Sequence, residues 1–189
     1  MIVSSRHRFV FAHVPKTGGI SIRAALEPFA DKANGIGVHD TLNTLLAARP
    51  ETRAYFKFAF VRNPWDRLVS FYFYARRFLA RPVPQLQSLS FEGMLRALDG
   101  GEAWTAGIFA MRPQTAMVAG ADFTGRFERL AQDFATACTR IGIAPTLPRK
   151  NASDHLAYAT YYNDWSRSFV TRHYAGDVDT FGYRFEAVS

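Results

Sequence analysis

The chain has 189 residues, of which 48% are hydrophobic and 21% charged, and its formal net charge at pH 7 is +7. This size and balance are typical of one globular domain with a sizeable core, so we expect residues 1–189 to form a single domain. The single cysteine, Cys138, excludes an internal disulfide. No apolar run reaches membrane-spanning length and the first residues do not form a signal peptide, so we expect a cytoplasmic protein.

Most of the positive charge comes from arginine, because only four of the 23 basic residues are lysine. Arginine is suited to planar, bidentate recognition of anions. The excess fits an anionic cofactor, an acidic polymer or nucleic acid, and charge alone does not decide among them. The sequence has no recognition-helix or aromatic-platform signature, so nucleic acid is not an expected partner.

In chain order, strands and helices alternate. Residues 9–14 favour a strand, residues 21–29 a helix, and residues 41–48 a short helix capped by Asp40 or Thr41. Residues 57–62 form a near-continuous apolar strand, as expected of a parallel strand covered on both faces.

Asn63 and Pro64 then start a helix, with asparagine as the cap and proline at the first helical position, and an apolar stripe carries this helix to about Phe78. Further elements are expected as a helix at 90–98, a strand at 123–127, a helix at 130–141 and a mostly helical segment at 158–174. Residues 104–119 have no clear assignment. The alternation predicts an α/β fold with a central parallel sheet flanked by helices.

The clearest chemical signal lies between the first strand and the first helix, in the run Pro15-Lys16-Thr17-Gly18-Gly19-Ile20-Ser21. The glycine pair lets the backbone curl where a side chain would clash, and the main-chain N–H groups at the helix start then point at one spot. A phosphate group fits there, held also by the lysine and by the threonine and serine hydroxyls. An ordinary strand–turn–helix corner is the plainer alternative.

The position of the lysine separates this loop from the common nucleotide loop. In G-x-x-x-x-G-K-[ST] the lysine follows both glycines, whereas Lys16 precedes them, so the loop indicates a phosphate-like group and not ATP hydrolysis. A second motif, Arg62-Asn63-Pro64-Trp65-Asp66-Arg67-Leu68-Val69-Ser70, begins at the end of the second strand. Open α/β sheets bind ligands at strand ends, so a phosphate there could touch Arg62 and Ser70. Taken singly, each is better explained as a surface residue.

Together the two motifs resemble those of the sulfotransferases that use 3′-phosphoadenosine 5′-phosphosulfate. Pro-Lys-Thr-Gly-Gly-x-Ser is similar to the loop for the 5′ end of the donor, and R-[ND]-P-x-x-R-x-x-S to the clamp for its 3′-phosphate. The resemblance implies the P-loop-NTPase-like sulfotransferase fold and adenosine 3′,5′-bisphosphate as the product. It assigns these residues to the donor: Pro15, Lys16, Thr17, Gly18, Gly19, Ile20, Ser21, Arg62, Ser70, Phe127, Arg149 and Lys150.

The last of these assignments come from downstream segments. Residues 123–130 resemble the segment with an aromatic-Glu pair beside the adenine, with Phe127 where tyrosine is common. Residues 147–153 resemble the loop that closes over the nucleotide, where Arg149 or Lys150 would reach the 3′-phosphate, although a solvated basic loop explains them equally well. Residues 177–185 resemble the carbohydrate branch of heparan 2-O and chondroitin 4-O type, which implies a hydroxyl acceptor on a glycan or glycolipid.

Sulfuryl transfer to a hydroxyl needs a base for the incoming proton and positive charge on the departing phosphate. Lys16 suits the second task. In the heparan and chondroitin branch a histidine in the region of His39 serves as the base, and an unperturbed imidazole titrates near pH ~6.5. His39 could instead be a surface histidine, and Glu27 and Glu51 are weaker candidates for the base. No His/Cys/carboxylate cluster has metal-ligand spacing, so no metal is expected.

We therefore interpret the chain as a transferase of the EC 2.8.2 type, a sulfotransferase with Lys16 and His39 as catalytic residues and a carbohydrate as the expected acceptor. Two rival interpretations stay open at this point. A small phosphotransferase or kinase would need a metal-binding acid and a standard nucleotide loop. A non-enzymatic basic module would bind a polyanion with an affinity that falls steeply with salt.

Overall fold

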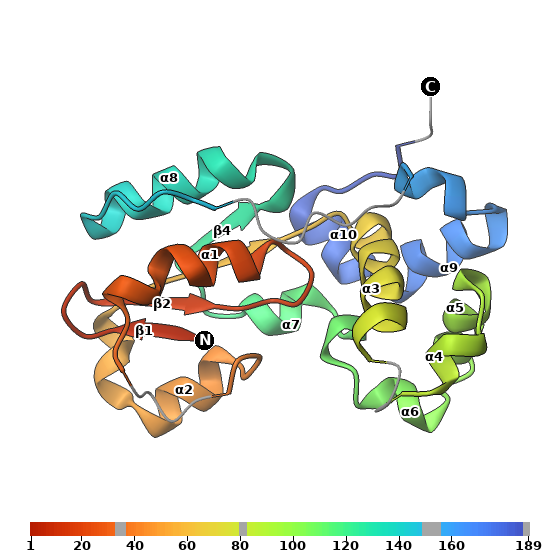
Figure 1. Cartoon of the computed structure of the whole chain (residues 1–189), viewed down its shortest axis with the longest axis horizontal. Helices are drawn as coiled ribbons and strands as arrows, with labels where there is room; N and C mark the ends of the chain where they lie inside the picture. The colour runs from red at the N-terminus through yellow and green to blue at the C-terminus, as the bar shows by residue number, and fades with distance from the viewer. Residues whose placement is uncertain (33–36, 80–82, 149–155, 187–189) are drawn as a thin grey trace. The chain divides into compact units, whose positions relative to one another are not determined.

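The structure is a computed structural model that describes residues 1–32, 37–79, 83–148 and 156–186. Its contacts divide the chain into two compact units, one made of Met1–Arg62 and Gln114–Ala152 and the other of Asn63–Pro113 and Ser153–Ser189. The sheet belongs to the first unit (Figure 1). Within the described ranges, no helix combines the length and the apolar character that crossing a membrane requires.

The strands are β1 (Ile2–Ser4), β2 (Phe9–Ala12), β3 (Phe56–Val61) and β4 (Phe123–Arg126). The α-helices of the first unit are α1 (Gly19–Leu26), α2 (Leu42–Ala48), α7 (Gln114–Val118) and α8 (Leu130–Ile141). Those of the second unit are α3 (Pro64–Phe78), α4 (Gln85–Ser88), α5 (Phe91–Asp99), α6 (Ala103–Ala106), α9 (Asp164–His173) and α10 (Ala175–Phe181). Short 3₁₀ helices are η1 (Glu27–Phe29), η2 (Pro50–Ala54), η3 (Phe109–Met111), η4 (Phe127–Arg129) and η5 (Tyr158–Tyr161).

The sheet has the strand order β1-β2-β3-β4. Strands β2, β3 and β4 run parallel, with Phe11 opposite Phe58 and Phe58 opposite Phe123, which confirms the predicted α/β class and the three predicted strands. Strand β1 pairs antiparallel with β2. The sequence does not predict β1, because three residues are too few to show a periodic pattern.

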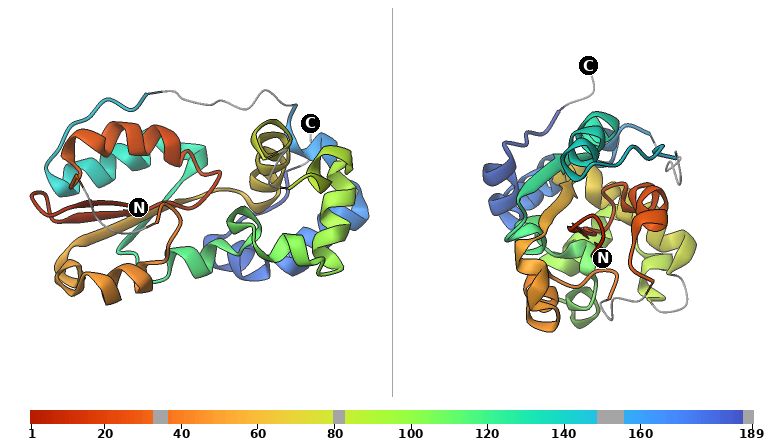
Figure 2. Two further views of the ribbon diagram at one scale, coloured as in Figure 1. Left: turned by 60° about the horizontal axis from the view of Figure 1, so that its bottom comes forward. Right: turned by 90° about the vertical axis from the view of Figure 1, so that its left-hand side faces the viewer.

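One face of this sheet carries the main core of the first unit. The rings of Phe9, Phe11, Phe58 and Phe60 are fully buried there, and residues of α1 and α8 pack against them. Helix α2 lies on the other side of the sheet from α1 and α8 (Figure 2). Cys138 on α8 belongs to this core, and burial raises the pKa of its thiol to about 11, so it is a packing residue as the sequence predicts.

Local capping sets the ends of the predicted helices. The Thr41 hydroxyl accepts a hydrogen bond from the main-chain N–H of Thr44 at 3.2 Å and caps α2, so threonine and not Asp40 is the cap. The Asn63 side chain accepts from the N–H groups of Trp65 and Asp66, and α3 ends at Phe78, as predicted. The unassigned residues 104–119 contain only α6, η3 and α7, which are too short to show a helical period.

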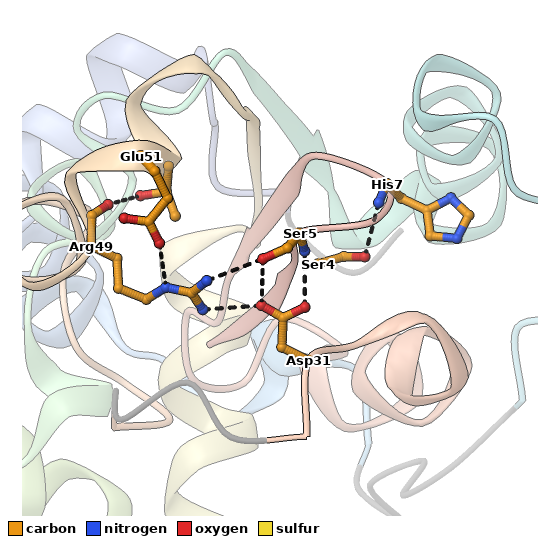
Figure 3. Close-up of polar contacts among 7 residues, drawn as sticks. Ser4, Ser5, His7, Asp31, Arg49 and Glu51 are labelled. Atoms are coloured by element: carbon orange, nitrogen blue, oxygen red, sulfur yellow. Dashed lines mark hydrogen bonds and ion pairs between the residues drawn. The ribbon is translucent and has the colours of Figure 1, made fainter.

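A polar network on the first unit centres on Arg49, directly after α2 (Figure 3). Its guanidinium contacts the Asp31 carboxylate at 3.1 Å, the Ser5 hydroxyl at 3.1 Å and the Glu51 carboxylate at 2.8 Å. The Asp31 carboxylate also accepts from the Ser5 main-chain N–H at 2.9 Å. Arg49 therefore joins the β1–β2 turn, the segment after α1 and the start of η2.

In the second unit, α3 is contacted by α4, α5 and α9 and by the short helices η3 and η5 (Figure 1). Arg67 on α3 is 1% exposed, and its Nη1 donates to the Arg112 carbonyl at 3.0 Å. The neighbouring Met111 carbonyl accepts from the buried Tyr174 hydroxyl at 2.7 Å. These buried side chains hold the main chain after η3, which gives Arg67 a structural role within its own unit.

Gly125 in β4 lies against a buried aromatic ring on the core face of the sheet. A Cβ at this position would lie 2.5 Å from Cε1 of the buried Phe60 ring. We expect Gly125→Ala to lower the free energy of unfolding by about 1–3 kcal/mol, because the ring has no room to move. Thermal unfolding followed by circular dichroism measures the change.

Gly107→Ala is the matched control. Gly107 has a φ of −78°, and no described heavy atom lies within 4 Å of an added Cβ. This variant should stay within about 0.5 kcal/mol of the wild type. Equal melting temperatures for both variants would contradict the packing argument.

Candidate functional site

The loop between β2 and α1 has the backbone of an anion-binding turn. Lys16 has a φ of 68° and Gly18 a φ of 80°, while residues 15, 17 and 19 have negative φ. Alternation of this kind directs successive main-chain N–H groups to one side, where they bind anions. The Thr17 hydroxyl donates to the Val14 carbonyl at 2.9 Å inside the loop and holds this conformation. Its one proton is used there, so the group that Thr17 offers an anion is its main-chain N–H.

Both glycines of the loop are required by what surrounds them. Gly18 is the N-cap of α1 in the left-handed region, and a Cβ there would lie 2.8 Å from Leu130 and 3.3 Å from Phe127. A Cβ on Gly19 would lie 2.0 Å from the His13 ring, closer than any two such atoms approach. The prediction that side chains would clash at these positions is confirmed.

Lys16 supplies a cation at the loop. Burial, followed by the charge of Arg62, lowers the pKa of its ammonium group from 10.5 to about 8. An anion bound at the loop would reverse both effects, because it replaces lost hydration and opposes the charge of Arg62. The loop is therefore a site where negative charge is favoured.

Arg62, the residue after β3, is held against this loop. It is 6% exposed, and its Nη1 donates to the Lys16 carbonyl at 3.3 Å. Its guanidinium lies over the Phe127 ring, 4.0 Å from the ring centre. The Gln114 side chain binds both main-chain groups of Arg62, accepting from its N–H at 2.9 Å and donating to its carbonyl at 2.8 Å. Three predicted residues of the first unit, Lys16, Arg62 and Phe127, are thus brought together.

Two histidines lie beside the loop. Nδ1 of His39 is 3.1 Å from the His13 carbonyl oxygen, and the two ring centres are 4.6 Å apart. His13 is buried, and burial together with the neighbouring positive groups lowers the pKa of its ring to about 2. Burial also lowers the pKa of His39 below 6.5, against the hydrogen bond to His13, which raises it. Both rings are therefore neutral at pH 7.

The alternative bases lie in less suitable places. Glu51 is exposed, and its hydrogen bond from Arg49 lowers the pKa of its carboxyl group (Figure 3). Glu27 begins η1 and is exposed. His7 is in the turn before β2, where its ring packs on Phe29. Of these candidates, His39 is the one in contact with a residue of the loop region.

The remaining predicted donor residues fall into three groups. In the loop, Pro15 and Ser21 are buried and Ile20 is 43% exposed. Ser70 belongs to the second unit, where it is 3% exposed on α3, and its role toward a 3′-phosphate stays a prediction. Arg149 and Lys150 lie outside the described residues.

Sequence reasoning missed the supports of the site. Gln114 carries no motif, and its two hydrogen bonds join positions 52 residues apart in the chain. The packing of Leu130 on Gly18 is equally invisible in the sequence, although the apolar spacing of α8 indicates that Leu130 faces inward. Within the described ranges, no three His, Cys, Asp or Glu side chains are arranged to hold a metal ion.

Because the pKa of Lys16 is lowered, we expect binding of a phosphate ligand to depend on pH. Near pH 8 the ammonium group is partly deprotonated in the free protein, so binding of adenosine 3′,5′-bisphosphate should take up a fraction of a proton. Affinity should then fall as pH rises above 8, because the charged form becomes scarcer. Isothermal titration in two buffers with different ionisation enthalpies measures the uptake.

Lys16→Arg serves as the control, since guanidinium stays charged in this range. It should bind the bisphosphate without that uptake. Equal uptake in wild type and variant would assign the proton to another group.

Comparison with known proteins gives one family and one curated relative. A model of the sulfotransferase family matches residues 1–184, which include both units. Carbohydrate sulfotransferase 14 of Mus musculus is 29% identical over 168 residues, which is 70% of this chain and 44% of that protein. The chain thus spans less than half the length of this curated relative. No solved structure matches it. With its fold and its family match in agreement, the chain belongs to the sulfotransferase family.

Proposed function

We propose that this chain transfers a sulfuryl group from 3′-phosphoadenosine 5′-phosphosulfate to a hydroxyl group of a carbohydrate acceptor. The observation that carries the proposal is the convergence of the alternating loop backbone, Lys16 and Arg62 in one unit. A donor with phosphate at both its 5′ and 3′ ends needs cationic and main-chain N–H partners, and family membership implies such a donor.

The residues of the loop fit the 5′ end of the donor. A diphosphate-like group next to Gly18 and Gly19 can approach the backbone closely, because no Cβ stands in the way. Lys16 then offers its ammonium group to the oxygens of the leaving phosphate. Arg62 would hold the 3′-phosphate, and we propose Ser70 as its partner. The Phe127 ring, with Arg62 on one side, would flank the adenine.

The bound donor supplies a sulfur atom with a good leaving group, and the residues of this chain supply charge and a base. His39 accepts the proton of the acceptor hydroxyl as its oxygen attacks sulfur in line. Lys16 stabilises the negative charge that develops on the departing phosphate oxygen. A neutral imidazole is required for the first task, and the lowered pKa of His39 keeps its ring neutral at pH 7.

The acceptor class is inferred from the printed name of the relative. The Mus musculus protein is named a carbohydrate sulfotransferase, and it aligns with 70% of this chain. A glycan or glycolipid is therefore the acceptor to test first. Incubation with labelled donor and a panel of glycans should give a mass gain of one sulfate on at least one of them. If no acceptor gains sulfate, the proposed function is contradicted.

Arg62→Ala should weaken binding of adenosine 3′,5′-bisphosphate by about 1.5–3 kcal/mol, roughly 10- to 150-fold in Kd, because a charge-assisted contact to phosphate is lost. Isothermal titration measures Kd directly. Arg53→Ala is the control, since it removes the same charge from an exposed position in η2. A Kd of Arg62→Ala that equals that of the control would leave Arg62 a purely structural role.

His39→Ala should separate chemistry from binding. A base acts in the transition state, so kcat should fall by about 10²–10⁴-fold while the Kd for adenosine 3′,5′-bisphosphate stays nearly unchanged. Turnover with the glycan that accepts sulfate and titration with the bisphosphate are measured on the same protein preparation. Turnover near the wild-type rate would reject His39 as the base.

A further inference from the structure

The contact between His39 and His13 determines which ring nitrogen of His39 holds the proton. A carbonyl oxygen can only accept a hydrogen bond, and the His13 carbonyl lies 3.1 Å from Nδ1 of His39. In a neutral imidazole one nitrogen is a donor and the other an acceptor. Nδ1 must therefore carry the hydrogen, and Nε2 keeps a lone pair.

We propose that the main-chain carbonyl of His13 is a positioning group that fixes His39 in the Nδ1–H tautomer and leaves Nε2 as the atom that takes the acceptor proton. This inference rests on the proposed function, which makes His39 the base. The reacting atom of His39 is then Nε2, and His13 is the residue that selects it.

His13 is well placed for this task because its own position is tightly determined. It follows β2 directly, and its ring stacks on the buried Phe11 with the ring planes 23° apart. The same ring fills the space over Gly19 that a Cβ would occupy. The ring packing and the strand together hold the His13 carbonyl in place. His13 thus both packs over Gly19 in the loop and orients His39.

The proton balance of the reaction follows from this tautomer. As the acceptor oxygen forms its bond to sulfur, its O–H bond breaks and the proton moves to the Nε2 lone pair of His39. The bond from sulfur to the bridging phosphate oxygen breaks, and its electron pair stays on that oxygen beside Lys16. His39 is then an imidazolium that keeps its Nδ1–H bond to the carbonyl, and the carbonyl dipole stabilises the new charge.

Other charged groups act on the pair from neighbouring segments. Arg23 on α1 and Lys16 in the loop disfavour a positive charge on the His13 ring, and Asp40 favours one on His39. The main-chain amino group of Met1 disfavours a positive charge on both rings. None of these groups replaces the carbonyl as the partner of Nδ1, so the tautomer follows from the geometry of that one contact.

Long-range ¹H–¹⁵N correlation spectra of the full chain at neutral pH read the tautomer directly. The signals of His39 are assigned by their absence in His39→Asn, and those of His7 serve as a reference. We expect the pattern of a ring protonated at Nδ1 and bare at Nε2. A ring protonated at Nε2 would overturn the proposal. The measurement needs no activity, so it is independent of whether the acceptor has been found.

A pair of amide substitutions gives a second test. The asparagine amide nitrogen sits at the position of Nδ1, two bonds from Cβ, whereas the glutamine amide nitrogen sits at the position of Nε2. His39→Asn should keep the bond to the His13 carbonyl and melt close to the wild type, and His39→Gln should melt at a lower temperature. Equal melting temperatures in the two variants would overturn the proposal.

Sulfate transfer measured on the same proteins distinguishes a failure of the proposed function from a failure of the tautomer assignment. Both amide variants lack a proton-accepting nitrogen, so both should lose about 10²–10⁴-fold in kcat if His39 is the base. The Nδ1–H tautomer in a protein that transfers no sulfate contradicts the proposed function alone. Transfer by a protein with the Nε2–H tautomer contradicts this inference alone.

Discussion

The contact between the His13 ring and Gly19 is the constraint on which the candidate site depends. The ring occupies the space of a missing Cβ, so the helix after the loop can start only from glycine at this position. That contact requires glycine at the first residue of α1, next to the turn whose alternating backbone suits an anion. It also holds the His13 carbonyl, the hydrogen-bond partner of His39. The shape of the loop and the orientation of His39 thus share one origin.

The second requirement is the concentration of positive charge at the end of the sheet. Arg62 is buried with its guanidinium between the Lys16 carbonyl and the Phe127 ring, and its charge helps to lower the pKa of Lys16. Holding cations close together in a partly buried place is unfavourable for the free protein. Such an arrangement would suit the proposed polyanionic donor, because the cations are already held together before the ligand arrives.

The polar groups outside the site have a different character. Arg49 is surrounded by carboxylate and hydroxyl partners, so its charge is satisfied and Glu51 is occupied (Figure 3). Arg67 gives its hydrogen bond to a main-chain carbonyl in the second unit. These side chains hold the fold through nearby acceptors, and Arg62 likewise donates to the Lys16 carbonyl. Lys16 and Arg62 differ in that the charge of one cation helps to lower the pKa of the other. This closeness of two cations is the feature that supports the proposed anion-binding role of the loop.

The sequence alone determined the features that depend on neighbours in the chain. Caps and apolar spacing placed α3 and α8 with their correct ends, and the glycine pair with its lysine identified the loop. The tertiary structure decided the long-range contacts: the antiparallel β1, the Gln114 side chain on Arg62, and the approach of His39 to the His13 carbonyl 26 residues earlier. A local pattern reports only on residues within a few turns of each other. Which distant side chains meet is decided when the sheet forms and brings the ends of its strands together.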